Sequence, residues 1–317
     1  DGFTKGDKNF ALSIMLGIAF SANAGGVATV IGTPPNSVLI GLLESEYNTQ
    51  ISFLKWMTMG LPFSIMMVSL CYLVLVKIMF PCNNIKFSTS ANVISDELKN
   101  LGKISKQEKR VLTIFAITVS LWITRTLINY IFPGLQLSDT IISLIGAISL
   151  FAIPMNFKKG DFVLHWNDTS KLAWGILLLF GGGLALAKGM ASSGLVAVIT
   201  EGIKSGGFSP IIVVCLLIVL MLFMTELMSN VALVAVLAPV VAGIAIGLNI
   251  PILNVLIPVT MASSCAFMLP MATPPNAIVF ASGYVRVSEM VRAGVLLNLL
   301  AVGLLILYYI FVIPFIF

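Results

Sequence analysis

A short segment that breaks helices occurs twice in this chain, each time inside a long apolar run. Residues 32–36 read Gly-Thr-Pro-Pro-Asn, and residues 272–276 read Ala-Thr-Pro-Pro-Asn. Two successive prolines interrupt a helix, because neither donates a backbone N–H and each ring clashes with the preceding turn. In a bilayer, the backbone groups freed by such a break are tolerated only where they line a cavity or hold a ligand. The two segments therefore predict a pair of broken helices.

The composition predicts an integral membrane protein. Hydrophobic residues make up 58% and charged residues 10% of the 317 residues, whereas soluble domains have about 25% charged residues. Several apolar runs reach the roughly 20 residues that a helix needs to span a bilayer. The net charge of +5 comes from basic residues in the loops between these runs, which is not the pattern of a nucleic-acid-binding surface. The expected partner is the lipid bilayer and not a nucleic acid.

Residues that could support catalysis or metal binding are sparse. Cys71, Cys215 and Cys265 lie in apolar stretches and Cys82 just after one, without a CxxC pair, so we assign neither a metal site nor a disulfide. The single histidine, His165, lies in a polar loop where a surface or interfacial role is expected. The motifs HExxH and GxSxG are absent, and we do not expect an enzyme.

Basic residues give the chain an orientation. They are concentrated in residues 82–110, so this loop is expected on the cytoplasmic side. Predicted spans at 112–131, 140–155 and 172–187 then alternate in direction, and the first broken helix enters from the inner side while the second enters from the outer side. Matched broken segments in inverted repeats indicate the binding site of a secondary transporter. The sequence therefore predicts a transporter.

A third polar interruption lies between the two breaks. Residues 225–230 read Thr-Glu-Leu-Met-Ser-Asn, between apolar arms at 211–224 and 231–248 that are marginal for full spans. We predict the tip of a re-entrant hairpin. Glu226 lies in this tip. An ionisable residue at membrane depth is a functional hypothesis by default, and the structural alternative is a carboxylate that pairs with free N–H groups at the tip. The sequence leaves both open.

The breaks and the hairpin tip have compatible chemistry. Helix N-termini present free N–H groups and a positive dipole end to a carboxylate or sulfate, while helix C-termini and unwound carbonyls suit Na⁺. No Arg or Lys lies near either break, so anion binding would depend on dipoles and co-bound cations. Residues 181–183, three glycines in an apolar span, indicate either close helix packing or a loosened helix near the substrate.

These motifs resemble the divalent-anion:sodium symporter family, the sodium-coupled dicarboxylate, citrate and sulfate transporters. Residues 225–230 are similar to the family's second Ser-Asn-Thr hairpin tip, residues 265–280 to the loop that follows it, and residues 21–36 to the equivalent loop of the first half. The resemblance implies an elevator mechanism, in which a mobile transport domain slides against a scaffold domain that forms a homodimer.

The resemblance also implies a set of binding residues. Substrate would be contacted by Ser229, Asn230, Val231, Thr273, Pro274, Thr33 and Pro34. A second sodium site would use Thr225, Met228, Asn230 and Ala272, and Gly32 would give a carbonyl to a partial first sodium site. Na⁺ is the expected coupling ion, and no organic cofactor is expected.

The chain departs from the family pattern in two places. Val231 stands where the family has Thr, so one hydroxyl is lost, which affects the expected substrate preference more than the fold. A first Ser-Asn-Thr hairpin would precede Asp1. We therefore expect an N-terminally truncated gene product that lacks part of the first sodium site.

The expected organisation follows the residue ranges. We expect a transport-domain broken helix of the first repeat (1–50), a scaffold or arm helix (51–81), a cytoplasmic basic loop (82–110), scaffold helices (111–170), connecting helices (171–208), the transport-domain hairpin and broken helix of the second repeat (209–284) and a terminal transmembrane helix (285–317).

The sequence thus predicts an all-α polytopic membrane protein of the inverted-repeat elevator type. We expect it to import a di- or tricarboxylate or another divalent anion with Na⁺, in a bacterial inner membrane. The pattern does not choose among succinate, citrate and sulfate. The alternatives are a sodium-independent dicarboxylate exchanger of the same fold and a non-transporting truncated remnant.

Overall fold

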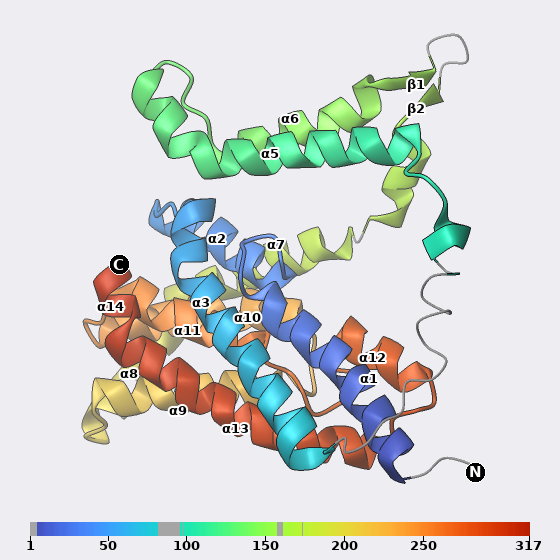
Figure 1. The fold of residues 1–317 in the computed structure, drawn as a ribbon. Coiled ribbons are helices and arrows are strands. Elements are labelled where there is room, and N and C mark those ends of the chain that lie inside the picture. Colours follow the sequence, from blue (N-terminus) through green and yellow to red (C-terminus); the bar gives the residue numbers. More distant parts are fainter. Residues whose placement is uncertain (1–4, 82–95, 97, 157–160, 173) are drawn as a thin grey trace. The chain divides into compact units, whose positions relative to one another are not determined.

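The computed structural model describes residues 5–81, 96, 98–156, 161–172 and 174–317 (Figure 1). Cys82, most of the predicted basic loop and the basic pair at 158–159 lie outside the described residues. The chain divides into two compact units. The first comprises Asp1–Ile51, Lys55–Ile85 and Trp174–Phe317, and the second comprises Ser52–Leu54 and Lys86–Ala173.

The first unit contains most of the helices. They are α1 (Lys5–Gly26), α2 (Pro34–Tyr47), α3 (Phe53–Tyr72) with the π-helix η1 (Leu73–Met79), α7 (Gly175–Ser192), α8 (Leu195–Ser205), α9 (Pro210–Met224), α10 (Asn230–Gly247), α11 (Ile252–Ser263), α12 (Pro274–Ala281), α13 (Val287–Phe311) and α14 (Ile313–Ile316). The second unit contains α5 (Lys106–Ile131), α6 (Asp139–Ala152), the strands β1 (Pro154–Asn156) and β2 (Asp161–Phe162), and the 3₁₀ helix η2 (Trp166–Lys171).

Several helices are long and apolar enough to cross a membrane. Among the described residues they are Phe53–Met79, Lys106–Ile131, Asn230–Gly247 and Val287–Ile316. The pair Leu177–Met190 and Leu195–Ser205, bent by 66°, passes the same test when taken as one span. The chain is therefore a mostly helical, polytopic membrane protein, as its composition predicts.

The two segments with paired prolines separate helices that pack crosswise. The chain leaves helix between α1 and α2 and again between α11 and α12. Helix α1 packs against α12, and α11 packs against α2, so the first half of each pair contacts the second half of the other (Figure 1).

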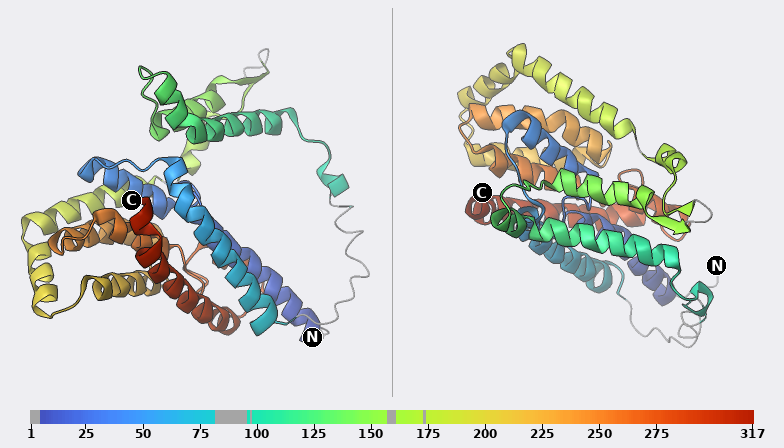
Figure 2. Two further views of the ribbon diagram at one scale, coloured as in Figure 1. Left: turned by 60° about the vertical axis from the view of Figure 1, so that its left-hand side comes forward. Right: turned by 90° about the horizontal axis from the view of Figure 1, so that it is seen from above.

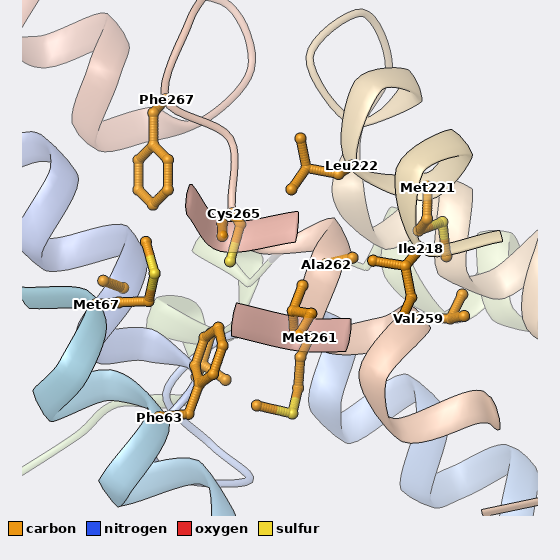
Figure 3. Packing of buried hydrophobic residues seen from close by; sticks show 14 of the residues in the cluster. Phe63, Met67, Ile218, Met221, Leu222, Val259, Met261, Ala262, Cys265 and Phe267 are labelled. Atoms are coloured by element: carbon orange, nitrogen blue, oxygen red, sulfur yellow. The ribbon is translucent and has the colours of Figure 1, made fainter. Parts of the chain in front are cut away.

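A core of aliphatic, aromatic and sulfur-containing side chains holds the first unit together. Figure 3 shows Phe63 and Met67 of α3 on the side of Met261 and of the loop after α11, with the labelled side chains of α9 on the opposite side. Phe20 of α1 packs edge-on against Phe267 of that loop, with 5.3 Å between ring centroids. Cys265 is a fully buried free thiol in this core, which agrees with a packing role.

The glycines at 181–183 lie in the regular helix α7, which packs against α10. A Cβ atom on Gly183 would lie 2.2 Å from the carbonyl oxygen of Ala235, whereas no described heavy atom lies within 4 Å of one on Gly181 or Gly182. Because any side chain at Gly183 would separate α7 from α10, the close-packing interpretation accounts for this position.

The second unit is a helical hairpin with a small polar end. Helices α5 and α6 lie side by side in both views of Figure 2. Asp139 at the start of α6 accepts a hydrogen bond from the backbone N–H of Phe53 (3.0 Å), the first residue of α3, which belongs to this second unit, and pairs with Arg125 (3.1 Å). His165 is exposed and precedes η2, where its backbone N–H donates to Asp168 (3.1 Å), in keeping with a surface role.

The structure differs from the sequence prediction most clearly at two helix boundaries and in one pair of strands. Helix α5 begins at Lys106 and not at residue 112, because Ser105 and Glu108 form a capping box. Helix α11 ends at Ser263 and not at residue 271. The antiparallel pair β1 and β2 was not expected in an all-α chain.

Candidate functional site

A cavity of about 420 Å³ lies between the two breaks and the start of α10, within the first unit. All the residues predicted to contact substrate line it: Thr33, Pro34, Ser229, Asn230, Val231, Thr273 and Pro274. Of the predicted sodium ligands, Gly32, Asn230 and Ala272 also line it. The structure therefore gathers segments that are some 200 residues apart in the sequence. Their binding roles remain predictions.

Three helices of the described chain begin at this cavity. Their N-cap residues are Thr33 for α2, Ser229 for α10 and Thr273 for α12. Each helix directs the positive end of its dipole toward the cavity, which favours a bound anion. None of the described residues that line the cavity carries a charge. The arrangement is therefore suited to an anion that is held by oriented dipoles.

The three N-termini do not offer the same hydrogen-bond donors. Helices α2 and α12 both begin with paired prolines, which lack N–H groups. The next N–H is already engaged: that of Asn36 donates to the carbonyl of Thr33 (3.2 Å), and that of Asn276 to the Thr273 hydroxyl (3.4 Å). The expectation of free N–H groups at both breaks therefore needs correction, because these ends supply a dipole and few donors.

The N-terminus of α10 supplies the hydrogen-bond donors. It has no proline in its first turn, so its first N–H groups lack intrahelical acceptors. The side chain of its N-cap, Ser229, makes no capping hydrogen bond within the described structure. The Ser229 hydroxyl, the Asn230 amide and these N–H groups can therefore donate to a ligand.

The asparagine that ends each proline motif makes the same pair of hydrogen bonds within its own loop. Each Nδ2 donates to the carbonyl oxygens ten and seven residues earlier: from Asn36 to Gly26 (3.5 Å) and Thr29 (2.9 Å), and from Asn276 to Ala266 and Leu269 (3.1 Å each). Both side chains are fully buried. The two loops thus share a hydrogen-bond pattern as well as a sequence motif.

Asn23, in the last turns of α1, connects this helix to the second loop. Its Nδ2 donates to the Asn276 side-chain oxygen (3.1 Å) and to the carbonyl of Ala266 (3.0 Å). Asn23 also lines the cavity. Sequence reasoning missed it, although an amide among the small residues at 21–26 is a signal that could have been noticed.

The predicted sodium ligands differ in how far their side chains are buried in the protein. Thr225 is fully buried, with its Oγ1 2.9 Å from the Asn230 Oδ1 and 2.7 Å from the carbonyl oxygen of Ser263. Met228 is 48% exposed and is not among the lining residues that the structure describes. Gly32 has no room for a side chain, since a Cβ would lie 2.4 Å from the carbonyl oxygen of Gly26.

Glu226 is buried against the loop that follows α11. Its Oε1 accepts from the backbone N–H groups of Phe267 (2.9 Å) and Met268 (3.0 Å) and from Asn298 Nδ2 (2.7 Å). Its Oε2 accepts from the N–H groups of Met268 (3.1 Å) and Leu269 (3.0 Å). Successive backbone N–H groups of this kind form an anion-binding nest. The contacts match the structural alternative, with donors from the loop and α13 in place of the hairpin tip.

The Glu226 contacts also explain why α11 ends early. Residues 267–269 turn their N–H groups toward the carboxylate, so these groups cannot continue the helical ladder beyond Ser263. The resulting loop carries Ala272 and Thr273 to the cavity.

Comparison with known proteins agrees with the motifs. Residues 3–315 match the family described as "Sodium:sulfate symporter transmembrane region". The chain is 36% identical over 309 residues to the sodium-dependent dicarboxylate transporter SdcS of Staphylococcus saprophyticus, a match that covers 96% of this chain and 59% of that protein. It is 36% identical over 310 residues to the transporter of the same name from Staphylococcus aureus strain RF122, covering 97% of this chain and 60% of that protein.

The chain therefore spans about 60% of the length of these relatives. The family match extends over nearly all of its residues and includes both proline motifs and residues 225–230. The resemblance to divalent-anion:sodium symporters is thereby confirmed, and the chain belongs to the sodium:sulfate symporter family.

Proposed function

We propose that this chain forms the binding site of a Na⁺-coupled symporter that imports a divalent carboxylate of the succinate type. The observation that carries the proposal is the uncharged cavity on which α2, α10 and α12 direct their N-termini. Its volume of about 420 Å³ lies within the range of about 300–1,000 Å³ that is usual for small-molecule sites. The names of the relatives, dicarboxylate transporters, support the same substrate class.

The lack of basic side chains among the described residues that line the cavity gives a physical reason for coupling to Na⁺. A dianion loses its hydration on entering the cavity, and buried charge is costly unless it is paired. The Ser229 hydroxyl, the Asn230 amide and the N–H groups of α10 can bind one carboxylate, but they carry no net charge. One Na⁺ at the oxygen atoms of Asn230 and Ala272, and another at the Gly32 carbonyl, would balance the anion. Substrate and cation would then bind favourably only together.

Val231 favours a dicarboxylate over sulfate. It lines the cavity where the family has a hydroxyl, and its methyl groups can contact the methylene carbons between two carboxylates. Sulfate presents oxygen in every direction, and an oxygen that faces Val231 would lack a donor. We therefore place succinate-like anions ahead of sulfate.

We further propose an inverted repeat and an elevator movement in a bacterial plasma membrane. The packing of α1 against α12 and of α11 against α2 supports antiparallel repeats. The division of the chain into two compact units supports a transport part and a scaffold part. In this scheme, α5 and α6 belong to the scaffold, which would form a homodimer.

Uptake of radiolabelled succinate into proteoliposomes tests the proposed function. We expect uptake with an inward Na⁺ gradient, little uptake when choline replaces Na⁺, and at least a tenfold loss in Asn230→Ala, because that change removes both a carboxylate donor and a sodium ligand. Citrate and sulfate are offered in parallel. Equal uptake in choline would indicate the exchanger instead, and saturable uptake of none of the three anions would contradict transport.

A further inference from the structure

Helix α11 ends beside the cavity with buried hydroxyls that lack partners. Within the described structure, the Oγ1 of Thr260 and the Oγ of Ser264 are buried and make no hydrogen bond. Ser264, at the C-cap of α11, lines the cavity together with Asn230 and Ala272. The Ser264 side chain is thus a buried polar group at the site with its bonding capacity unused. Native structures contain few such groups, and a missing ligand is one of their physical explanations.

The surroundings of Ser264 are rich in uncharged oxygen atoms. The Thr225 hydroxyl lies within 2.9 Å of both the Asn230 amide oxygen and the carbonyl of Ser263, the residue just before Ser264. Ala272 is buried and lines the same cavity. Hydroxyl, amide and carbonyl oxygens are the ligands that hard cations prefer.

The position of Ser264 also favours a cation over an anion. It lies at the C-terminal end of α11, where the helix dipole is negative and attracts positive charge. The anion-attracting N-termini are those of α2, α10 and α12. The cavity is therefore lined by two helix ends of cation-binding polarity, those of α1 at Gly26 and of α11 at its C-cap Ser264, and an unused hydroxyl stands at the end of α11.

We propose that the Ser264 hydroxyl oxygen is a direct Na⁺ ligand. It completes the second sodium site beside Asn230 and Ala272, to which the family resemblance assigns no serine from α11. This inference rests on the proposed function. Ser264 supplies the site with an oxygen from the first half of the second broken helix, so the ion contacts the hairpin tip and both sides of the break.

Thermal unfolding of the purified protein at increasing Na⁺ concentration, with choline chloride keeping the ionic strength constant, tests the assignment. Na⁺ that binds the folded state raises the midpoint temperature in a saturable way. In Ser264→Ala we expect the Na⁺ concentration for half of the effect to rise roughly tenfold, as for loss of one oxygen ligand. Ser264→Cys should show a similar rise, because a thiol of nearly the same size is a poor ligand for a hard cation.

Thr260→Val is the matched control. Thr260 is also buried on α11 with an unpartnered hydroxyl, but it is not among the lining residues, so its variant should keep the wild-type Na⁺ dependence. Wild-type Na⁺ dependence in Ser264→Ala would overturn only this inference and would leave the proposed function standing. A weaker affinity for succinate with unchanged Na⁺ affinity would also overturn it, by assigning the hydroxyl to the anion. Lack of any saturable Na⁺ effect in the wild type would overturn the proposed function itself.

Discussion

Replacement of Glu226 by alanine is expected to lower the free energy of unfolding by on the order of 4 kcal/mol and to abolish Na⁺-dependent succinate uptake. The carboxylate is 2% exposed and accepts hydrogen bonds from three successive backbone N–H groups and from Asn298. Alanine leaves these buried or partly buried donors without their acceptor. The loop that carries Ala272 and Thr273 would lose its anchor, so the cavity would change shape as well.

Glu226→Gln separates the bonding role from side-chain size. A glutamine keeps one acceptor oxygen, but its NH₂ group would face at least one N–H donor, and we expect roughly half of the loss seen with alanine. Glu201→Gln, on the exposed side of α8, is the control and should behave as wild type. Thermal unfolding and uptake measure both effects. Full activity and stability in Glu226→Ala would show that the carboxylate does not hold the loop.

The second large effect is expected at Asn276. Asn276→Ala removes two donated bonds, to Ala266 and Leu269, and one accepted bond, from Asn23. We expect a loss of about 3 kcal/mol in the free energy of unfolding. The loop would also be free to move relative to α12, so the apparent succinate affinity should fall with the stability.

Asn36→Ala is the matched variant at the corresponding position of the first motif. One of its donated bonds is long, at 3.5 Å, and its Oδ1 has no hydrogen-bond partner within the described structure. We therefore expect a smaller loss, about 1–2 kcal/mol. Thermal unfolding of both variants in parallel measures the difference. Equal losses, or a larger one at Asn36, would contradict the bonding that distinguishes the two loops.

The sequence was most informative where local chemistry decides the structure. Paired prolines end a helix regardless of what surrounds them, so both breaks could be located. The start of α5 could have been placed equally well, because Ser105 and Glu108 have the spacing of a capping box. The predicted substrate residues came from these breaks and from the polar interruption at 225–230, and they line one cavity, whereas the predicted sodium ligands Thr225 and Met228 are not among the described lining residues.

Long-range contacts were beyond the sequence. The donors to Glu226 lie 41–43 and 72 residues away, and no periodicity in the chain indicates which N–H groups a carboxylate will meet. The early end of α11 follows from the same contacts. Ser264 carried no signal either, since a serine near a helix end usually satisfies its hydroxyl locally, and only the folded arrangement shows that this one does not.

Protection of a cysteine at position 231 from a thiol reagent tests the central claim most directly. Val231 is half-buried and lines the cavity. In a background whose four native cysteines are replaced by alanine, Val231→Cys should react with a small maleimide, and succinate with Na⁺ should slow this reaction severalfold. Succinate in choline should have little effect. Leu227→Cys, 73% exposed on the same tip and outside the lining set, should react at one rate throughout. Unchanged labelling of Val231→Cys at succinate concentrations that saturate uptake would place the binding site elsewhere.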